Sequence, residues 1–595
     1  MAKKHPQRAL IAGLSWYGCI LLTIALAGCP RFTGFYAVFL GLSLAILGSG
    51  LPMLNAVYRG GKSSLAPGFR KLTGYAIVAQ YVALALPRVE WENTGLITDA
   101  RAAFLYALTL LCTAAGIAFV ILMTQDPSYP RRDKNARKAR KRGIVVWVLE
   151  WVDALASAII AVILIETFLF QLYQVPTESM VPIFLAGDRP FTVKLMNGPR
   201  LPLTELRLPF LREPGRGDVV TIANPRYPEN SGVNLKKYLS QMIYMATFTL
   251  VNIDKVAADG TPKADPLVKR IVGVPGEKLM MVDDVLYSRT AAQPDYRPVS
   301  VDSERFAQID LWKLPAAVRA KVQAIPVDER MRTLLAKWDA AKNGGDPGAL
   351  ASRLLDEWTL LSSHLAGMSL MMLSAFEQKQ LPLANQGITT LRDAAMRFAP
   401  AGALNPISRT GAGTEDVSLA LAVARSASAR AALKEYVTAG AAGTAGPTAY
   451  ERGSRNLNLI IKRNLLRRID RDLVLIETGA SSQAIDADTD RAGLIQEARE
   501  LYAYLVGYYD MRNFPEFPAG AAFLGPDQYF AMGDNRYNSL DFRFSEKPRL
   551  RALDAADASS ILYSSLLAPF PLEKRFIEGW AIFRAWPFSR LGAIR

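Results

Sequence analysis

A serine lies between two prolines in the stretch Gln174-Val175-Pro176-Thr177-Glu178-Ser179-Met180-Val181-Pro182-Ile183-Phe184, which directly follows a long apolar run. Proline lacks a backbone N–H and its ring clashes with the preceding helical turn, so Pro176 and Pro182 prevent a helix from continuing through the serine. The apolar run is long enough to cross a membrane. Ser179 is therefore predicted to lie where the chain leaves the lipid.

A serine hydroxyl is a weak nucleophile unless a neighbouring base accepts its proton, and histidine is the usual base. The chain contains 2 histidines, His5 in the N-terminal tail and His364 in an apolar run that has the pattern of a packed helix. Neither is a natural partner for Ser179. If Ser179 is catalytic, its base must be a different side chain, and lysine is the known substitute.

Lys269 is the candidate base. It lies in Leu267-Val268-Lys269-Arg270-Ile271-Val272-Gly273-Val274-Pro275-Gly276-Glu277, which is predicted to be a β-strand that ends in a Pro-Gly turn. Alternation along the strand places Lys269 on the same face as Ile271 and opposite Arg270. Burial on an apolar face disfavours the charged form of a lysine, as a general base requires. From this pattern alone, a solvated lysine on an edge strand remains the alternative interpretation.

A third segment is rich in turn-forming residues and reads Gly533-Asp534-Asn535-Arg536-Tyr537-Asn538-Ser539-Leu540-Asp541-Phe542-Arg543. Three other segments precede it, Pro-Thr-Glu-Ser-Met-Val-Pro at 176–182, Arg-Gly-Asp-Val-Val at 216–220 and the lysine segment at 268–277. In this order the four segments closely resemble the sequence boxes of bacterial type I signal peptidases. The tail 588–594 is also similar to the C-terminal end of that family.

The resemblance implies a peptidase that uses a serine and a lysine. Ser179 matches the nucleophile and Lys269 the general base. Thr177 matches the position whose hydroxyl helps to form the oxyanion hole with the backbone N–H of Ser179. The implied reaction is hydrolysis of one peptide bond just outside the membrane, in a secretory preprotein that is still anchored by its signal peptide.

The resemblance also assigns supporting roles in the third segment. Ser539 matches the serine that hydrogen-bonds and orients the lysine, and Asp541 and Arg543 match a supporting ion pair. Residues 534–536 are interpreted as scaffolding of the loop. Tyr537 is a departure, because the family often has aspartate there, but no catalytic group is missing.

The implied partners are secretory preproteins with Ala-X-Ala-type cleavage sites, and membrane lipid. No cofactor or metal is expected, because the 3 cysteines lie in or beside apolar spans and no phosphate-binding glycine loop is present. The formal charge of +16 is interpreted as membrane anchoring rather than nucleic-acid binding. A dense basic cluster at 131–142 lies between two apolar spans, where cytoplasmic anchors are found.

Five membrane spans are predicted from apolar runs, at about 9–29, 35–57, 72–86, 102–123 and 145–170. With the N-terminus inside, the cytoplasmic segments contain fifteen Lys and Arg residues and the outer loops three. This asymmetry predicts a multi-pass protein of the cell membrane (the inner or plasma membrane), with its catalytic domain on the periplasmic, extracytoplasmic side. The run Leu26-Ala27-Gly28-Cys29 resembles a lipoprotein box, but an uncleaved first membrane helix is the preferred interpretation.

The predicted fold is a multi-span α-helical membrane anchor joined to a mainly β, antiparallel catalytic domain with a large helical insertion. The predicted domains are 1–173 (membrane), 174–290 (first catalytic part), 291–515 (insertion) and 516–595 (second catalytic part). Strands are predicted at 189–195, 218–222, 268–272, 278–282, 528–532 and 581–585. Helices are predicted at 303–342, 349–380, 418–436 and 454–509, with a break near Ser481 and a small-residue linker at 439–446.

Two other classes of protein remain open from the residues. A membrane-anchored scaffold that keeps the peptidase fold without its activity would explain the additional spans and the insertion. A self-cleaving Ser-Lys regulator related to repressor-type proteases would use the same dyad. Those regulators are soluble, whereas the spans of this chain place its serine at the outer face of a membrane.

Overall fold

The computed structural model describes residues 100–125, 144–199, 208–227, 265–300, 315–322, 327–368 and 414–594, with a few scattered positions elsewhere. The chain divides into two compact units. Unit 1 comprises Met1–Gln171, Val193–Glu213 and Ala223–Leu267. Unit 2 comprises Leu172–Thr192, Pro214–Ile222 and Val268–Arg595.

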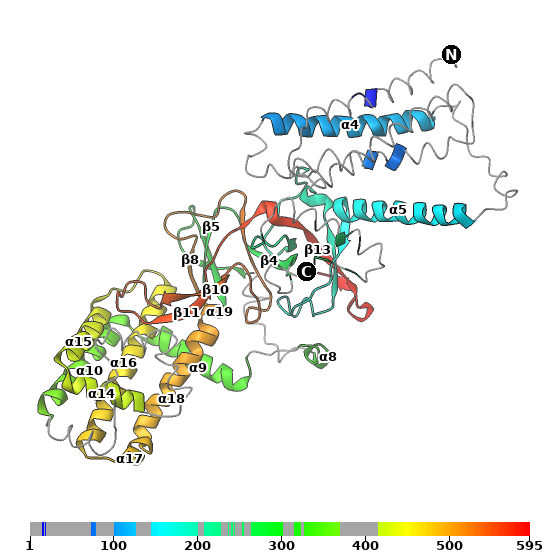
Figure 1. The fold of residues 1–595 in the computed structure, drawn as a ribbon. Helices are drawn as coiled ribbons and strands as arrows, with labels where there is room; N and C mark the ends of the chain where they lie inside the picture. The colour runs from blue at the N-terminus through cyan, green and yellow to red at the C-terminus, as the bar shows by residue number, and fades with distance from the viewer. Residues whose placement is uncertain are drawn as a thin grey trace. The chain divides into compact units, whose positions relative to one another are not determined.

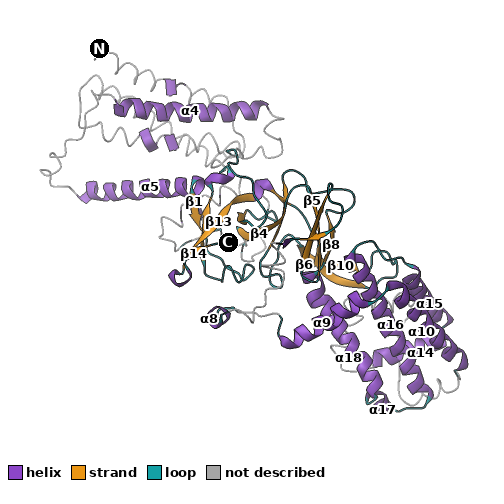
Figure 2. Ribbon diagram, turned by 180° about the vertical axis from the view of Figure 1, so that it is seen from behind, coloured by secondary structure: helices purple, strands orange, loops and turns teal. Residues whose placement is uncertain are grey.

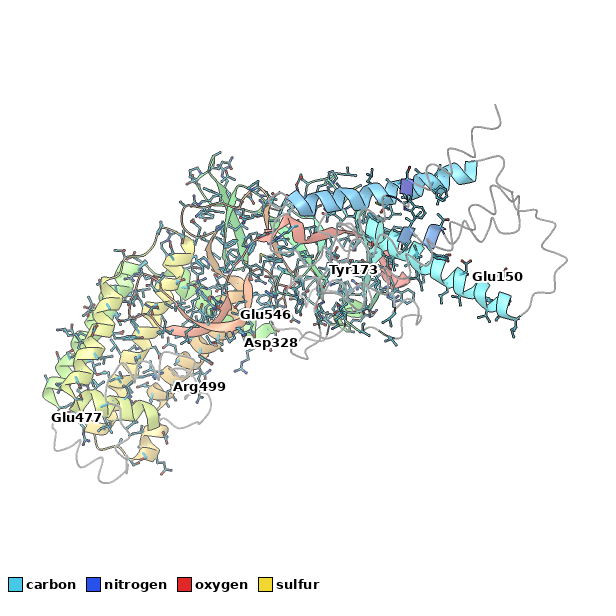
Figure 3. All side chains as sticks on the ribbon, turned by 45° about the horizontal axis from the view of Figure 1, so that its top comes forward. Glu150, Tyr173, Asp328, Glu477, Arg499 and Glu546 are labelled. Carbon is cyan, nitrogen blue, oxygen red and sulfur yellow. The ribbon has the colours of Figure 1, made fainter. Side chains whose placement is uncertain are left out.

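Unit 1 contains two long apolar helices, α4 (Ala100–Gln125) and α5 (Ile144–Phe168) (Figure 1). Within α5, Glu150–Phe168 is the one stretch of the described residues that is long and apolar enough to cross a membrane. The side chains of Trp147 and Trp151 on this helix are 53% and 62% exposed, as expected for a surface that lipid covers. Glu150 lies near the start of α5 (Figure 3).

The helix α5 coincides with the predicted span at 145–170, and α4 with the predicted span at 102–123. In α4 only Leu110–Ile121 qualifies as a shorter apolar helix. The predicted spans at 9–29, 35–57 and 72–86 lie almost entirely outside the described residues, as does the basic cluster at 131–142. A multi-span anchor therefore stays a prediction.

The larger of the β-sheets has eight strands, in the order β1-β2-β13-β3-β4-β9-β12, with β14 paired to β13. Strand β4 pairs antiparallel with β9, and β13 pairs antiparallel with β3 and β14. The strands are β1 (Phe170–Leu172), β2 (Arg189–Val193), β3 (Val219–Ile222), β4 (Leu267–Gly273), β9 (Gln528–Met532), β12 (Leu572–Glu573), β13 (Ile577–Trp586) and β14 (Gly592–Ala593).

A second sheet has four strands in the order β7-β6-β5-β8, namely β5 (Glu277–Val282), β6 (Val285–Thr290), β7 (Arg297–Pro298) and β8 (Phe514–Phe517). Strands β10 (Phe544–Ala552) and β11 (Leu562–Leu567) form a separate antiparallel hairpin. The antiparallel, mainly β catalytic domain is therefore confirmed. All six predicted strands are present. Strands β6, β8, β10 and β11 were not predicted because their polar and apolar residues do not alternate clearly, and β1, β7, β12 and β14 were not predicted because they have only two or three residues.

The chain between β7 and β8 is called here the helical insertion. Most of its described helices form a bundle in unit 2, whereas α8 (Ala316–Arg319) lies apart from them (Figure 2). The described helices of the insertion are α8, α9 (Glu329–Gly344), α10 (Pro347–Gly367), α14 (Thr414–Arg425), α15 (Ala427–Ala442), α16 (Ala449–Glu477), α17 (Ser482–Asp486), α18 (Thr489–Tyr504), a π-helical turn η6 (Leu505–Tyr509) and α19 (Asp510–Arg512). Buried leucines such as Leu354, Leu433 and Leu473 form its core.

Local sequence signals set the ends of these helices. Asp328 begins α9 by accepting a hydrogen bond from the N–H of Met331, so the described part of the predicted helix at 303–342 is divided into α8 and α9, while 303–314 and 323–326 lie outside the described residues. The predicted break near Ser481 is confirmed, because α16 ends at Glu477 and Gly479 adopts a φ of +72°. The predicted linker at 439–446 is partly wrong, since α15 continues to Ala442. Alanine favours helix, and this outweighs the glycines in that stretch.

His364 joins two helices of the insertion. Its Nδ1 lies 2.9 Å from Asp470 and its Nε2 lies 2.9 Å from Glu477, which is at the end of α16 (Figure 3). Burial alone lowers the pKa of His364, but the hydrogen bonds and charges of the two carboxylates outweigh burial and raise the pKa above its ordinary value. The side chain is a structural link between α10 and α16.

The raised pKa of His364 predicts a pH-dependent stability. The stabilising interaction is complete below the unfolded-state pKa of about 6.5 and is lost as the pH rises through the higher folded-state pKa. We expect the melting temperature of the wild type to fall more between about pH 6 and pH 9 than that of His364→Gln, which cannot gain the charge. Calorimetry at both pH values measures this, and equal falls in the two proteins would contradict it.

Candidate active site

Ser179 lies in a tight turn whose next residues are buried. The N–H of Val181 donates to the carbonyl of Glu178 at 3.1 Å, and the N–H of Phe184 donates to the carbonyl of Met180 at 2.9 Å. Met180 and Phe184 are completely buried in an apolar cluster that also contains residues of β3 and β13. The serine itself is 9% exposed. Its backbone is therefore fixed by the packing of its neighbours.

Lys269 on β4 lies directly against this serine. Its Nζ is 2.8 Å from Oγ of Ser179, although the two residues are 90 positions apart in the sequence. Lys269 is 3% exposed, and Ile271 and Val272 on the same strand are also buried. Thr177 completes the group, because its Oγ1 lies 3.3 Å from Oγ of Ser179. The structure thus brings together the three residues to which the sequence assigned the chemistry.

Ser539 is next to this group, but it does not form the predicted hydrogen bond to the lysine. Among the described residues, its buried Oγ has no hydrogen-bond partner. The hydroxyl lies against Gly533 instead, since a Cβ added to that glycine would be 2.2 Å from Oγ of Ser539 and 2.4 Å from the carbonyl oxygen of Ser179. Only glycine permits this approach of the 533–543 loop to the nucleophile. An orienting role for Ser539 stays a prediction.

Asp541 and Arg543 form the predicted ion pair. Nε and Nη2 of Arg543 donate to the two carboxylate oxygens at 2.8 and 2.9 Å, and both side chains are completely buried. The N–H of Gly533 donates to Asp541 at 2.9 Å. Burial raises the pKa of Asp541, but the charge and hydrogen bonds of Arg543, the Gly533 N–H and the charge of Lys269 outweigh burial and leave the pKa below its usual value. Asp541 is therefore ionised and connects Arg543 to the loop.

A second buried ion pair, between Arg270 and Asp534, was not predicted from the sequence. Nε and Nη2 of Arg270 donate to the carboxylate of Asp534, both at 2.8 Å, and Nη1 donates to the carbonyl of Gly217 at 2.7 Å. Alternation correctly placed Arg270 opposite Lys269, but it predicted only one buried face for β4. Both faces are buried, and the charge of Arg270 is neutralised by a residue that is 264 positions away. Sequence pattern alone gives no means of identifying such a partner.

Asn535 attaches the same loop to the nucleophile. Its N–H donates to the carbonyl of Ser179 at 3.1 Å, and its Nδ2 donates to the carbonyl of Glu178 at 3.2 Å. The C-terminal tail holds the other side of the turn, because Nη1 of Arg590 donates to Asp188 at 2.6 Å and Nη2 donates to the carbonyl of Pro182 at 3.2 Å. The segment that contains Ser179 is thus fixed by contacts from both sides.

The Arg-Gly-Asp segment aligns β3 with β4. Gly217 has a φ of +89°, and its N–H donates to the carbonyl of Ile271 at 2.8 Å. Asp218 accepts hydrogen bonds from the N–H of Gly215 at 2.8 Å and from Nε1 of Trp580 at 3.0 Å. No group of three or more His, Cys, Asp or Glu side chains within the described part of the chain is arranged to hold a metal ion.

A buried Ser-Lys pair on an antiparallel β-fold is the arrangement of a class of serine peptidases, and part of the chain is similar to proteins of that class. Residues 148–316 match the family described as signal peptidase, peptidase S26. This region includes Ser179 and Lys269, and the structure adds the 533–543 loop to it. The resemblance to bacterial type I signal peptidases is therefore confirmed.

Several relatives carry the name Signal peptidase I. The protein of Buchnera aphidicola subsp. Baizongia pistaciae is 29% identical over 121 residues, which cover 20% of this chain and 28% of the relative. That of Bacillus licheniformis is 28% identical, covering 24% of this chain and 50% of the relative. Signal peptidase I T of Bacillus subtilis is 27% identical, covering 27% and 60%. The chain thus spans between about a quarter and three-fifths of the length of these relatives. No solved structure matches it significantly.

The Arg270–Asp534 pair leads to a prediction about stability. Asp534→Ala leaves the guanidinium of Arg270 buried without its counter-ion, so we expect the free energy of unfolding to fall by about 3–5 kcal/mol. Denaturant titration measures this. The control is Asp527→Ala, because Asp527 is 75% exposed and pairs with Lys574 at 3.8 Å, and an exposed pair contributes about 0–1 kcal/mol. Equal losses in the two variants would show that the buried pair has no special role.

Proposed function

We propose that this protein is a membrane-bound serine endopeptidase that removes N-terminal signal peptides from secreted preproteins. The observation that carries the proposal is the hydrogen bond of 2.8 Å between Nζ of the buried Lys269 and Oγ of Ser179. The match to the signal peptidase family and the names of the relatives support the same activity. A membrane-anchored scaffold without peptidase activity would not require a contact between Lys269 and Ser179.

In the proposed mechanism, Oγ of Ser179 attacks the scissile carbonyl while neutral Lys269 accepts the serine proton and later returns it to the leaving amine. A carboxylate beside the lysine would favour its protonated form. Asp541 interacts electrostatically with Lys269, but its bidentate pairing with Arg543 offsets its charge within the site. The ion pair therefore serves the base by limiting the pull of Asp541 on the lysine proton.

The oxyanion of the tetrahedral intermediate would be stabilised by the backbone N–H of Ser179 and the hydroxyl of Thr177. In the free enzyme, Oγ1 of Thr177 donates to Oγ of Ser179 at 3.3 Å. That geometry is long for a hydroxyl hydrogen bond, so the hydroxyl is free to turn toward a developing oxyanion. A single donor of this kind typically contributes a factor of about 10²–10³ in rate.

The proposed preprotein substrate and the proposed side of the membrane rest on the sequence around Ser179. Helix α5 ends at Phe168, only eleven residues before Ser179 in the sequence, which supports a nucleophile near the membrane surface. A preprotein anchored by its signal helix would present its cleavage site at this level. We propose cleavage after Ala-X-Ala-type sequences, on the extracytoplasmic side of a multi-pass cell-membrane protein.

The dyad predicts the effect of two substitutions. We expect Ser179→Ala and Lys269→Ala each to lower the rate of preprotein cleavage by at least about 10²-fold, because each removes one half of the nucleophile–base pair. The assay is processing of a purified preprotein in detergent. Lys278→Met is the matched control, since Lys278 is also a buried strand lysine but pairs with Glu516. Cleavage by Lys269→Ala at the control rate would exclude the dyad.

The proposed orientation predicts which residues are accessible from outside the cell. In a cysteine-free background, we expect Arg137→Cys to react with a membrane-impermeant maleimide only after the cells are permeabilised. Leu550→Cys on β10 should react in intact cells, because Leu550 is 61% exposed and lies in unit 2, which also contains Ser179 and Lys269. Labelling of position 137 in intact cells would contradict the positive-inside arrangement.

A further inference from the structure

The helical insertion meets the catalytic loop 533–543 at the turn between β5 and β6. This turn consists of Asp283 and Asp284, which have φ values of 50° and 70°. Positive φ is uncommon for residues other than glycine, and aspartate tolerates it better than most side chains. The turn points its two carboxylates at different helices, since Asp283 pairs with Lys342 of α9 and Asp284 pairs with Arg512 of α19.

Asp284 is shared between the insertion and the catalytic loop. Nε of Arg512 donates to its Oδ2 at 2.7 Å, and the hydroxyl of Tyr537 donates to the same oxygen at 3.0 Å. The backbone N–H of Asp284 also donates to the carbonyl of Arg512 at 3.0 Å. Arg512 continues the network by donating to Asp339 of α9 at 2.8 Å. Asp284 is 5% exposed, and the two side-chain donors satisfy its Oδ2, whereas its buried Oδ1 has no hydrogen-bond partner among the described residues.

Two further contacts connect the last turn of the insertion to the loop. Nη1 of Arg543 donates to the carbonyl of Met511 at 2.5 Å. The rings of Tyr508 and Tyr537 meet edge to face, with their centroids 6.5 Å apart. Arg543 is the residue that neutralises Asp541, so one side chain joins the insertion to the ion pair of the site. The insertion also shares an apolar core with the β-domain, which includes Met280 and Val282 of β5.

The opposite side of the same loop contacts the nucleophile. Gly533 packs against the carbonyl of Ser179, and the N–H of Asn535 donates to that carbonyl at 3.1 Å. The loop therefore lies between the dyad on one side and the end of the insertion on the other. Tyr537 stands in the middle of the loop, at the position where the sequence departs from the common aspartate of the family.

We propose that Tyr537 and Arg512 are positioning residues, through which the helical insertion holds the 533–543 loop against Ser179. This inference rests on the proposed peptidase function. Because the loop fixes the carbonyl of Ser179, a displacement at Tyr537 changes the direction from which Oγ meets Lys269 and the substrate. Small misplacements of reacting groups have large effects on rate.

The test compares two tyrosines whose hydroxyls each donate to a carboxylate. Tyr537→Phe removes the hydroxyl that reaches Asp284 and keeps the ring that meets Tyr508. Tyr563→Phe is the control, because the hydroxyl of Tyr563 on β11 also donates to a carboxylate, that of Asp510 at 2.6 Å, and Tyr563 is not part of the loop. Both variants lose one hydrogen bond to a carboxylate, so we expect them to lose similar thermal stability.

Two measurements on the full-length protein in detergent distinguish the variants. We expect Tyr537→Phe to lower kcat on a short soluble peptide about tenfold while KM stays within about twofold, and Tyr563→Phe to leave both unchanged. Hydrogen exchange of the segment 533–543 should become faster in Tyr537→Phe and stay at the wild-type level in Tyr563→Phe. Arg512→Met should reproduce the Tyr537→Phe result in both measurements.

Either of two outcomes overturns the proposal: wild-type exchange of 533–543 in Tyr537→Phe, or a kcat that changes equally in Tyr537→Phe and Tyr563→Phe or not at all. The exchange measurement also separates this inference from the proposed function. If the wild type cleaves no preprotein, the peptidase proposal fails. Faster exchange of the loop in Tyr537→Phe alone would still support the attachment of the loop to the insertion, and unchanged exchange would overturn it.

Discussion

The close approach of the 533–543 loop to Ser179 is the constraint on which the site depends. The loop reaches the serine only because Gly533 has no side chain, and it stays there because Asp534 is paired with Arg270 on the strand that carries the lysine. One loop therefore contacts the carbonyl of the nucleophile and neutralises the residue next to the base. The contacts of Asn535 with the serine turn, and the pair of Asp541 and Arg543, hold the loop in the same position.

The site contains more buried charge than its proposed chemistry needs. Buried ion pairs seldom increase stability over well-packed apolar residues, because desolvation opposes the attraction between the charges. They do restrict the arrangement, since a carboxylate that loses its partner is strongly penalised. Arg270 with Asp534, and Arg543 with Asp541, are both bidentate and both buried. The two pairs thus fix the direction and register of the loop, which apolar contacts alone would specify less sharply.

The sequence predicted the chemical groups of the site better than their surroundings. Ser179, Thr177 and Lys269 could be found because the segments that contain them resemble, in the same order, the sequence boxes of a known peptidase family. The partner of Arg270 could not, because nothing local distinguishes Asp534 from other loop acids. The hydrogen bond expected between Ser539 and Lys269 is absent. The sequence could not show this, because the position of the Ser539 hydroxyl depends on how closely Gly533 packs against it. Strands β6 and β8 were missed because pairing with β5, rather than local pattern, defines them.

The position of the insertion in the sheet explains how the fold tolerates it. The chain leaves the second sheet after β7 and returns as β8, which pairs with β5 at the opposite edge of that sheet. Lengthening such a connection adds little loop-closure entropy, so the β-domain can keep its pairing whatever is inserted. A freely attached insertion would need no polar contacts with the site. Arg512 and Met511, at its last turn, nevertheless contact Asp284 and Arg543. These contacts make the return of the chain into β8 also the point at which the helical bundle supports the catalytic loop.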